Sequence, residues 1–235
     1  MSDTERIHGS DRLDELSREF LLEAVQTRYV YNFTWMGRPI IQLPQDIVAM
    51  QEVIYQVRPD MIVETGVAHG GSLVYYSSLM DMMGLTDGIV VGVDIDIRAH
   101  NRAALEAHPT YGRMRLIQGS SVDPDVAAQV KELAAGRKRV IVTLDSMHTH
   151  DHVRRELELY SPLVTRGSYL VVFDTAVEWL PKEMYPDRPW GPGDNPMTAV
   201  QEFLRANPRF EIDRAMEQKL ALTVAPSGYL RCVAD

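Results

Sequence analysis

The chain has 235 residues, and 24 Lys+Arg against 33 Asp+Glu give a formal net charge of −9 at pH 7. A hydrophobic content of 45% is typical of one globular domain and excludes a disordered or collagen-like chain. The acidic balance argues against nucleic-acid binding through a basic face. Cys232 is the only cysteine, which excludes a disulfide framework and a cysteine-built metal cluster. Because apolar runs are short and the N-terminus is polar, we expect no membrane span, no signal peptide and a cytoplasmic location.

Two helices and an aromatic loop are predicted near the N-terminus. Apolar side chains recur at intervals of three and four residues from Asp11 onward, which predicts an amphipathic helix. Residues 29–43 are rich in aromatic residues, glycine and proline and predict a loop, whereas residues 44–57 predict a second helix that ends before Pro59. We expect residues 1–10 to lack regular structure. Residues 1–58 would form a cap that packs as one compact unit on the domain of residues 59–235.

Short β-rich runs and helical segments then alternate along the chain. The runs lie at residues 61–64, 89–93, 114–117, 140–144 and 169–173, and the helical segments at residues 72–83, 99–107, 123–135 and 150–160. The runs are almost continuously apolar, as expected for parallel strands covered on both faces. This repeated βαβ pattern predicts an α/β fold with a doubly wound, Rossmann-like sheet.

The C-terminal third of the chain departs from this alternation. Residues 174–195 form a proline- and glycine-rich loop, which we interpret as a lid or binding loop. A helix is predicted at residues 196–206. Residues 220–224 and 229–233 flank Pro-Ser-Gly and predict a β-hairpin.

Ligands of open parallel sheets bind beyond the carboxyl ends of the strands, so the residues after each predicted strand are the candidates. The first strand is followed by Glu-Thr-Gly-Val-Ala-His-Gly-Gly-Ser at residues 64–72. Glycines let a ligand approach the backbone, and the next helix directs its free N–H groups there. A dinucleotide fingerprint would have glycine at Ala68, and Glu64 suits an ammonium or sulfonium better than a pyrophosphate. The turn therefore favours S-adenosylmethionine over NAD; the alternative is a tight turn with nothing bound.

The second and third strands are followed by residues suited to the rest of a nucleoside. Asp94 suits the two hydroxyls of a ribose, or else caps a helix. Ser120 and Ser121 could contact an adenine edge; it is equally open that Ser121 or Asp123 caps the next helix.

Acids and histidines follow the fourth and fifth strands. Asp145 is placed to hold a divalent metal or the cofactor amine, and His148 to take a proton from a substrate hydroxyl. Asp174 is a second strand-tip acid, so that the two carboxylates could hold Mg²⁺ jointly, unless they are unconnected acids in polar loops. We expect His150 and His152 to start a helix and face solvent, and a zinc triad of all three histidines is disfavoured.

Two aromatic groups are candidates for walls over this site. Tyr31, Phe33 and Trp35 come from the first loop, and Trp179 and Trp190 from the second. Walls of this kind would exclude water from a methyl transfer. The alternative is that each aromatic side chain is a core or oligomer contact.

Several of these motifs together resemble the cephalosporin hydroxylase family, whose members have class I methyltransferase folds and are related to rhamnosyl O-methyltransferases of natural-product and antibiotic pathways. The matching stretches run from about residue 30 onward. They include Trp-Met-Gly-Arg-Pro-Ile-Ile-Gln-Leu-Pro-Gln-Asp at 35–46, Val-Glu-Thr-Gly-Val-Ala-His-Gly-Gly-Ser at 63–72, Gly-Val-Asp-Ile-Asp at 92–96, Leu-Asp-Ser-Met-His at 144–148 and Gly-Pro-Gly-Asp-Asn-Pro at 191–196.

The resemblance implies a seven-stranded, mostly parallel sheet with an antiparallel C-terminal hairpin strand, and S-adenosylmethionine as cofactor. It places the cofactor on Glu64, Gly66, Ala68, His69, Gly71, Ser72, Asp94, Ser120, Ser121 and Asp145. It also implies Mg²⁺ held by acids after the fourth and fifth strands. The antibiotic-pathway relative has Asp-Asp-Ala-His at residues 145–148 and Glu-Asp at 173–174, so Ser146 and Phe173 here leave Asp145 and Asp174 as ligands.

The predicted reaction is transfer of the sulfonium methyl group to a hydroxyl of a sugar or small secondary metabolite, with His148 and Asp145 as catalytic residues. An NAD-type oxidoreductase and a non-catalytic cofactor-binding partner remain as alternatives at this stage. We expect a small-molecule acceptor, no nucleic acid and no membrane as partners, with a homo-oligomer possible.

Overall fold

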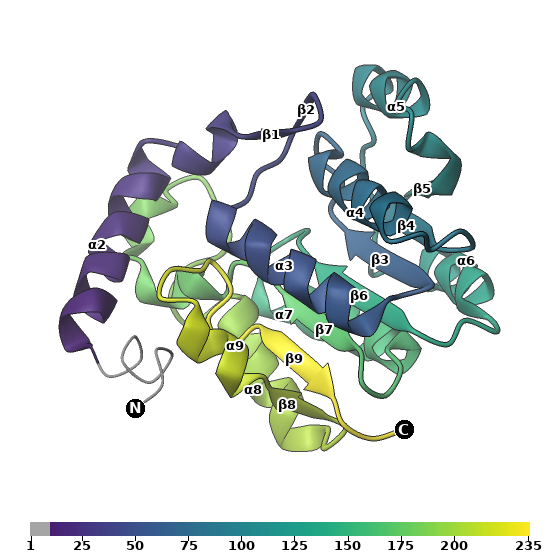
Figure 1. Cartoon of the computed structure of the whole chain (residues 1–235). Coiled ribbons are helices and arrows are strands. Elements are labelled where there is room, and N and C mark those ends of the chain that lie inside the picture. The colour runs from purple at the N-terminus through teal and green to yellow at the C-terminus, as the bar shows by residue number, and fades with distance from the viewer. Residues whose placement is uncertain (1–9) are drawn as a thin grey trace.

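The computed structural model describes residues 10–235 and confirms the predicted fold class. The expectation for residues 1–9 lies outside the described residues. Seven strands form one sheet in the order β5-β4-β3-β6-β7-β9-β8 (Figure 1). These strands are β3 (Met61–Thr65), β4 (Ile89–Asp94), β5 (Met114–Gln118), β6 (Val140–Leu144), β7 (Tyr169–Val172), β8 (Phe210–Ile212) and β9 (Tyr229–Cys232). The first five are parallel, and β9 runs antiparallel to both β7 and β8.

Helices cover both faces of this sheet (Figure 1). One apolar core joins α3 (Pro44–Val57) and α4 (Gly71–Met82) to the sheet, with α5 (Ala99–Glu106) and α9 (Arg214–Lys219) at its margins. A second core on the opposite face joins α6 (Pro124–Ala134), α7 (His150–Tyr160) and α8 (Pro196–Ala206). Every residue of β3 and β6 is buried, which explains why their sequences are apolar runs without alternation.

The N-terminal segment lies at the carboxyl edge of the sheet. Helix α2 (Asp11–Gln26) packs Leu21 against Leu43, Ala176 and Leu180, so it reaches the loop that follows β7. The predicted aromatic loop contains a 3-10 turn (Tyr29–Asn32) and a two-stranded ribbon of β1 (Thr34–Trp35) and β2 (Arg38–Pro39). The division of the chain at residue 58 stays a prediction. Within residues 10–235, no helix combines the length and the apolar character that crossing a membrane requires.

One element of the predicted C-terminal hairpin is wrong. Residues 220–224 form no strand, and β9 pairs instead with β8, which precedes helix α9. The physical reason is a buried carboxylate. Asp46 accepts hydrogen bonds from Thr223 Oγ1 at 2.5 Å and from the backbone N–H of Val224 at 2.9 Å, which fastens this segment to α3 rather than to a β-ladder.

The proline- and glycine-rich loop is more ordered than its composition predicts. It contains two 3-10 turns, at Thr175–Trp179 and Lys182–Met184. Asn195 then caps α8 with a capping box, in which its side chain accepts from the backbone N–H of Met197 and Thr198. Regular structure therefore fixes the loop at both of its ends.

Candidate functional site

A cavity of about 820 Å³ lies where the parallel strands β3 to β7 end. That volume lies in the range of small-molecule binding sites. Residues predicted for the site line it from every strand tip: Gly66, Ala68, His69, Gly71, Ser72, Asp94, Ser120, Ser121, Asp145, His148 and Asp174. The structure thus brings together all but one of the predicted residues, Glu64 being the exception.

The turn after β3 is tightly fitted against the neighbouring strands. Gly66 has φ +91°, and a Cβ atom there would lie 2.0 Å from the backbone oxygen of Asp145, so only glycine fits. Asp94 Oδ2 accepts hydrogen bonds from the N–H groups of Val67 at 2.7 Å and Ala68 at 3.1 Å. The second oxygen, Oδ1, accepts from the backbone N–H of Asp96 at 2.9 Å, so both oxygens of Asp94 fix backbone at the cavity wall.

The N-terminal ribbon supports this turn from outside. Arg38 donates to the backbone oxygen of His69 through Nε at 3.0 Å and Nη2 at 2.6 Å, and to Asn101 Oδ1 at 2.9 Å. A Cβ atom on Gly71 would lie 2.1 Å from the backbone oxygen of Pro39. The motif at residues 35–46 therefore has a physical role, because it clamps the start of α4 beside the cavity.

Glu64 lies beneath the turn rather than in the cavity. Its side chain is fully buried, accepts a hydrogen bond from the Ser72 hydroxyl and contacts Thr143 Oγ1 at 3.4 Å. Burial raises the pKa of Glu64 to about 7, because its effect is larger than that of the hydrogen bonds, which lower the pKa. Ser72 lines the cavity, so it connects Glu64 to any ligand there.

His152 lines the cavity, and the expectation that it faces solvent is wrong. Its side chain is 17% exposed, and Nε2 lies 3.1 Å from both Ser121 Oγ and Ser146 Oγ. His152 and Glu156 stand one turn apart on α7, a spacing visible in the sequence that signals one helix face. His150 does start α7, and its imidazole contacts Thr198 and Glu202.

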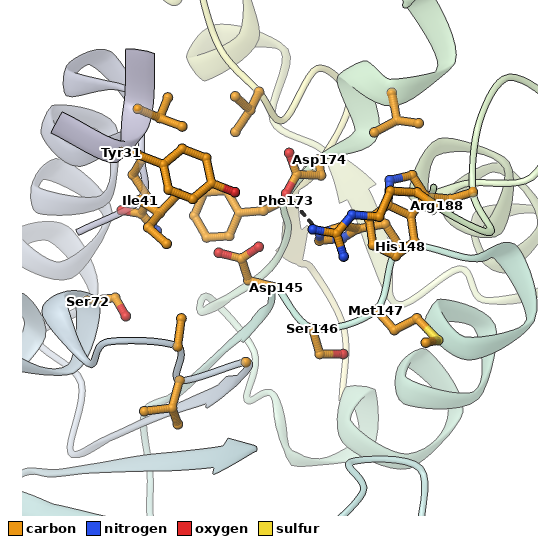
Figure 2. Close-up of a pocket in the computed structure, with 18 of the residues that line it drawn as sticks. Tyr31, Ile41, Ser72, Asp145, Ser146, Met147, His148, Phe173, Asp174 and Arg188 are labelled. Atoms are coloured by element: carbon orange, nitrogen blue, oxygen red, sulfur yellow. Dashed lines mark ion pairs between the residues drawn. The ribbon is translucent and has the colours of Figure 1, made fainter. Parts of the chain in front are cut away.

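Asp145, His148 and Asp174 form a compact cluster at the tips of β6 and β7. One ligand atom from each lies within 4.8 Å of the others, and His148 Nε2 is 3.3 Å from Asp174 Oδ2 (Figure 2). Burial, and then the nearby charge of Asp174, raises the pKa of Asp145 well above its usual range. Asp174 adopts a left-handed backbone with φ +56°, a conformation that aspartate tolerates better than most residues other than glycine.

This cluster fits a divalent cation. Two carboxylates held close together repel each other, and a cation between them would remove that repulsion. Ser146 and Phe173 add no carboxylate to this cluster, and the Ser146 hydroxyl is directed away, donating to Glu156 Oε1 at 2.7 Å. The donor set is therefore two carboxylates with one imidazole beside them, and solvent or substrate oxygens would complete a Mg²⁺ shell.

A further part of the cavity lining is largely apolar and comes from segments distant in the sequence. Its lining includes Leu21, Ala24, Val25, Tyr31, Ile41, Val177, Met184, Tyr185 and Trp190. Figure 2 shows Tyr31 and Ile41 on one side of the two aspartates, with His148 and Arg188 on the other.

Two of the five aromatic residues predicted as walls line the cavity, namely Tyr31 and Trp190. The Trp190 ring meets the His148 ring edge-on, with centroids 4.8 Å apart. Trp35 instead packs on Tyr75, and Trp179 stacks under Arg18. The contribution of α2 and of Arg188 was not predicted, since no local pattern marks a residue as facing a cavity built by a remote loop.

The strand order and the cavity at the strand tips are typical of doubly wound α/β folds that bind a nucleoside cofactor. The sequence model described as Rhamnosyl O-methyltransferase/CmcI matches residues 27–233. The chain therefore belongs to the Rhamnosyl O-methyltransferase/CmcI family, which confirms the resemblance and disfavours an oxidoreductase or a non-catalytic partner.

Similar curated proteins carry the same family description. Rhamnosyl O-methyltransferase of Mycobacterium tuberculosis (strain H37Rv) is 30% identical over 200 residues, covering 84% of this chain and 77% of that protein. The protein of the same name from Mycobacterium leprae (strain TN) is 30% identical over 205 residues, covering 86% and 84%.

Solved structures share the fold at lower identity. The structure titled "cmcI-D160 Mg-SAM" has a TM-score of 0.60 at 22% identity, covering 87% of this chain and 78% of that one. The apo structure of CalS11, a TDP-rhamnose 3'-O-methyltransferase of calicheamicin biosynthesis, has a TM-score of 0.53 at 19% identity, covering 83% and 86%.

Proposed function

We propose that the enzyme transfers the methyl group of S-adenosylmethionine to a hydroxyl of a sugar, with a rhamnose-type deoxysugar as the preferred acceptor. The supporting observation is that the glycine turn after β3 and the cluster of Asp145, His148 and Asp174 line one cavity. The curated relatives are named for methylation of rhamnosyl groups, and the acceptor class is taken from them.

The cofactor would lie along the wall formed by β3, β4 and β5. The turn from Gly66 to Ser72 offers backbone N–H groups at the start of α4 to its amino-acid part. Asp94 lies at the next strand tip and suits the ribose hydroxyls, while Ser120 and Ser121 suit the adenine edge. Glu64 would act on the positive sulfonium from beneath the turn, through its charge rather than through contact.

The acceptor hydroxyl would lie between the cofactor and the apolar part of the cavity. When His148 donates its Nε2–H to Asp174, Nδ1 is the free nitrogen that takes the hydroxyl proton. Alignment of acceptor oxygen, methyl carbon and sulfur by the cavity walls supplies much of the rate, an effect worth about 7–11 kcal/mol in well-oriented reactions. Tyr31 and Trp190 would exclude water from that line.

Asp145 and Asp174 would hold Mg²⁺, with His148 at the margin of its shell. A bound Mg²⁺ supplies Lewis-acid chemistry by lowering the pKa of a coordinated hydroxyl. The side chains of this protein position the acceptor and accept its proton.

The proposal is tested by incubating the protein with S-adenosylmethionine carrying a ¹³C-methyl group, Mg²⁺ and p-nitrophenyl α-L-rhamnoside. We expect a new ¹³C-labelled O-methyl ether in the product, identified by mass spectrometry and NMR. The matched control acceptor is p-nitrophenol, which has no sugar hydroxyl. Label on both acceptors alike, or on neither across a panel of glycosides, would contradict sugar O-methylation.

A further inference from the structure

A buried carboxylate lies behind the cavity wall at the end where the adenine is proposed to bind. Glu156 is fully buried, and its Oε2 atom has no hydrogen-bond partner in the part of the chain the structure describes. Its Oε1 atom accepts from the Ser146 hydroxyl at 2.7 Å and lies 3.5 Å from His152 Nε2. A buried charge is costly unless hydrogen bonds satisfy it, so the loss of either contact would be unfavourable.

This carboxylate fixes the direction of every hydrogen bond that leads from it to the cavity. A carboxylate only accepts hydrogen bonds, so the Ser146 hydroxyl must donate its single hydrogen to Glu156. Ser146 Oγ can then only accept from His152, whose Nε2 lies 3.1 Å away. Nε2 therefore carries a hydrogen, and this holds for the neutral imidazole and for the imidazolium alike.

The chain of hydrogen bonds ends at Ser121. Its hydroxyl oxygen lies 3.1 Å from the same Nε2 atom of His152 and has no other side-chain partner among residues 10–235. Because Nε2 carries a hydrogen, it cannot accept the hydrogen of Ser121. That hydrogen is directed elsewhere, and Ser121 lines the cavity beside His152 and Ser146.

We propose that Glu156 and His152 make Ser121 a hydrogen-bond donor that selects adenine as the base of the cofactor. This inference rests on the proposed placement of the cofactor. Adenine presents an unprotonated N1 acceptor on its edge, which matches a hydroxyl donor. Hypoxanthine carries a hydrogen on N1, so two donors would face each other at this position. His152 and Glu156 are positioning residues, since they act through Ser121, and Ser121 is the residue that determines specificity.

The test compares the binding of two neutral ligands that differ in this edge, S-adenosylhomocysteine and S-inosylhomocysteine, by isothermal titration calorimetry. For the wild-type protein we expect S-adenosylhomocysteine to bind at least about tenfold more tightly, because a buried donor left unpaired loses that much or more. Glu156→Gln keeps the shape but adds an amide donor, which lets the chain of hydrogen bonds reverse. In that variant we expect the preference to fall to within about threefold.

Two further variants separate this selection from a merely structural role. Glu158→Gln removes an exposed carboxylate from the same helix and should keep the wild-type preference. Ser121→Ala, which creates no new contact, should weaken S-adenosylhomocysteine binding and strengthen S-inosylhomocysteine binding, because the hydroxyl that opposes the N1 hydrogen of hypoxanthine is removed. An unaltered preference in Glu156→Gln, or an equal loss of both ligands in Ser121→Ala, would overturn the inference. Failure of the wild-type protein to bind S-adenosylhomocysteine would instead overturn the proposed function.

Discussion

The Nε2 atom of His148 lies 3.3 Å from Oδ2 of Asp174, although 25 residues of chain (149–173) lie between the two. The carboxylate favours a hydrogen on the near nitrogen of an imidazole whose ring also meets the Trp190 ring edge-on. A histidine fixed at one nitrogen by a carboxylate has its other nitrogen available to a substrate.

His148→Ala should lower kcat by about 10²–10⁴, because a positioned general base contributes that much. The affinity for S-adenosylhomocysteine should stay unchanged, since no proton moves on cofactor binding. Steady-state kinetics and calorimetry measure the two effects separately. The matched control is His150→Ala, whose imidazole contacts Thr198 and Glu202 instead of the cavity. Full turnover in His148→Ala would remove the residue from its proposed role.

Chelation should abolish methyl transfer, and added Mg²⁺ should restore it. Asp174→Asn should raise the Mg²⁺ concentration needed for half-maximal activity and weaken Mg²⁺ binding measured by calorimetry, because one of two carboxylates is lost. Asp151→Asn, a change at an exposed residue of α7, serves as the control and should alter neither quantity. Undiminished activity of the wild-type protein after exhaustive chelation would exclude a metal from the reaction.

The preference for S-adenosylmethionine over S-adenosylhomocysteine should rise between pH 6 and pH 8. Burial raises the pKa of Glu64 to about 7, so its negative charge appears as the pH passes that value. The charge attracts the sulfonium of S-adenosylmethionine, whereas the neutral sulfur of S-adenosylhomocysteine gains nothing. In the ratio of the two dissociation constants, the effects of pH on the parts that both ligands share cancel. In Glu64→Gln the step near pH 7 should be absent, and its persistence there would assign it to another group.

The ionisation of Asp46 should cost stability. Burial raises its pKa from 3.8 to about 6 in the folded protein, so the folded state binds more protons than the unfolded state between these values. The stabilising contribution of the Asp46 carboxyl to the free energy of unfolding is therefore fully present below pH 3.8, and it is lost as the pH rises through 6. Two pKa units correspond to about 3 kcal/mol.

Asp46→Asn removes this titration and supplies the comparison. From pH 4 to pH 7, the free energy of unfolding of the wild-type protein should fall relative to that of the variant, by up to about 3 kcal/mol. Urea denaturation at each pH gives both values. A difference that is constant with pH, or that moves in the opposite direction, would contradict the assigned pKa.

Gly66→Ala should destabilise the protein far more than Gly136→Ala. Both glycines have positive φ, +91° and +79°, but only Gly66 has a close neighbour, the backbone oxygen of Asp145 at 2.0 Å from a built Cβ atom. Gly136 has nothing within 4 Å, so its variant measures the backbone strain alone, about 1 kcal/mol. The Gly66 variant should lose more than this and should also lose cofactor binding. Equal losses in the two variants would mean that the close approach to Asp145 carries no energy.

The sequence predicted the parts of this protein that local patterns control. Buried parallel strands are apolar runs, and their tips must meet at one edge, so the positions of Gly66, Asp94 and Asp145 followed from the parallel direction of the strands alone. Local patterns did not predict which strand pairs with β9. The strand expected at residues 220–224 is absent because the distant Asp46 binds that segment.

The side-chain directions at the site were also beyond local patterns. Glu64 points beneath the turn to Ser72, because residues of one strand alternate between the two faces of the sheet, and its action on the cofactor stays a prediction. His152 was expected in solvent, although its spacing from Glu156 places both on the inner face of α7. The four-residue spacing within a helix therefore indicates that the side chain of His152 faces inward together with that of Glu156.

A crystal structure of the protein with S-adenosylhomocysteine tests the central claim most directly. The account predicts the amino-acid part of the ligand at the turn from Gly66 to Ser72, the ribose at Asp94 and the adenine edge at Ser121, with the sulfur facing the cluster of Asp145, His148 and Asp174. Density for the nucleoside anywhere outside this cavity would contradict it.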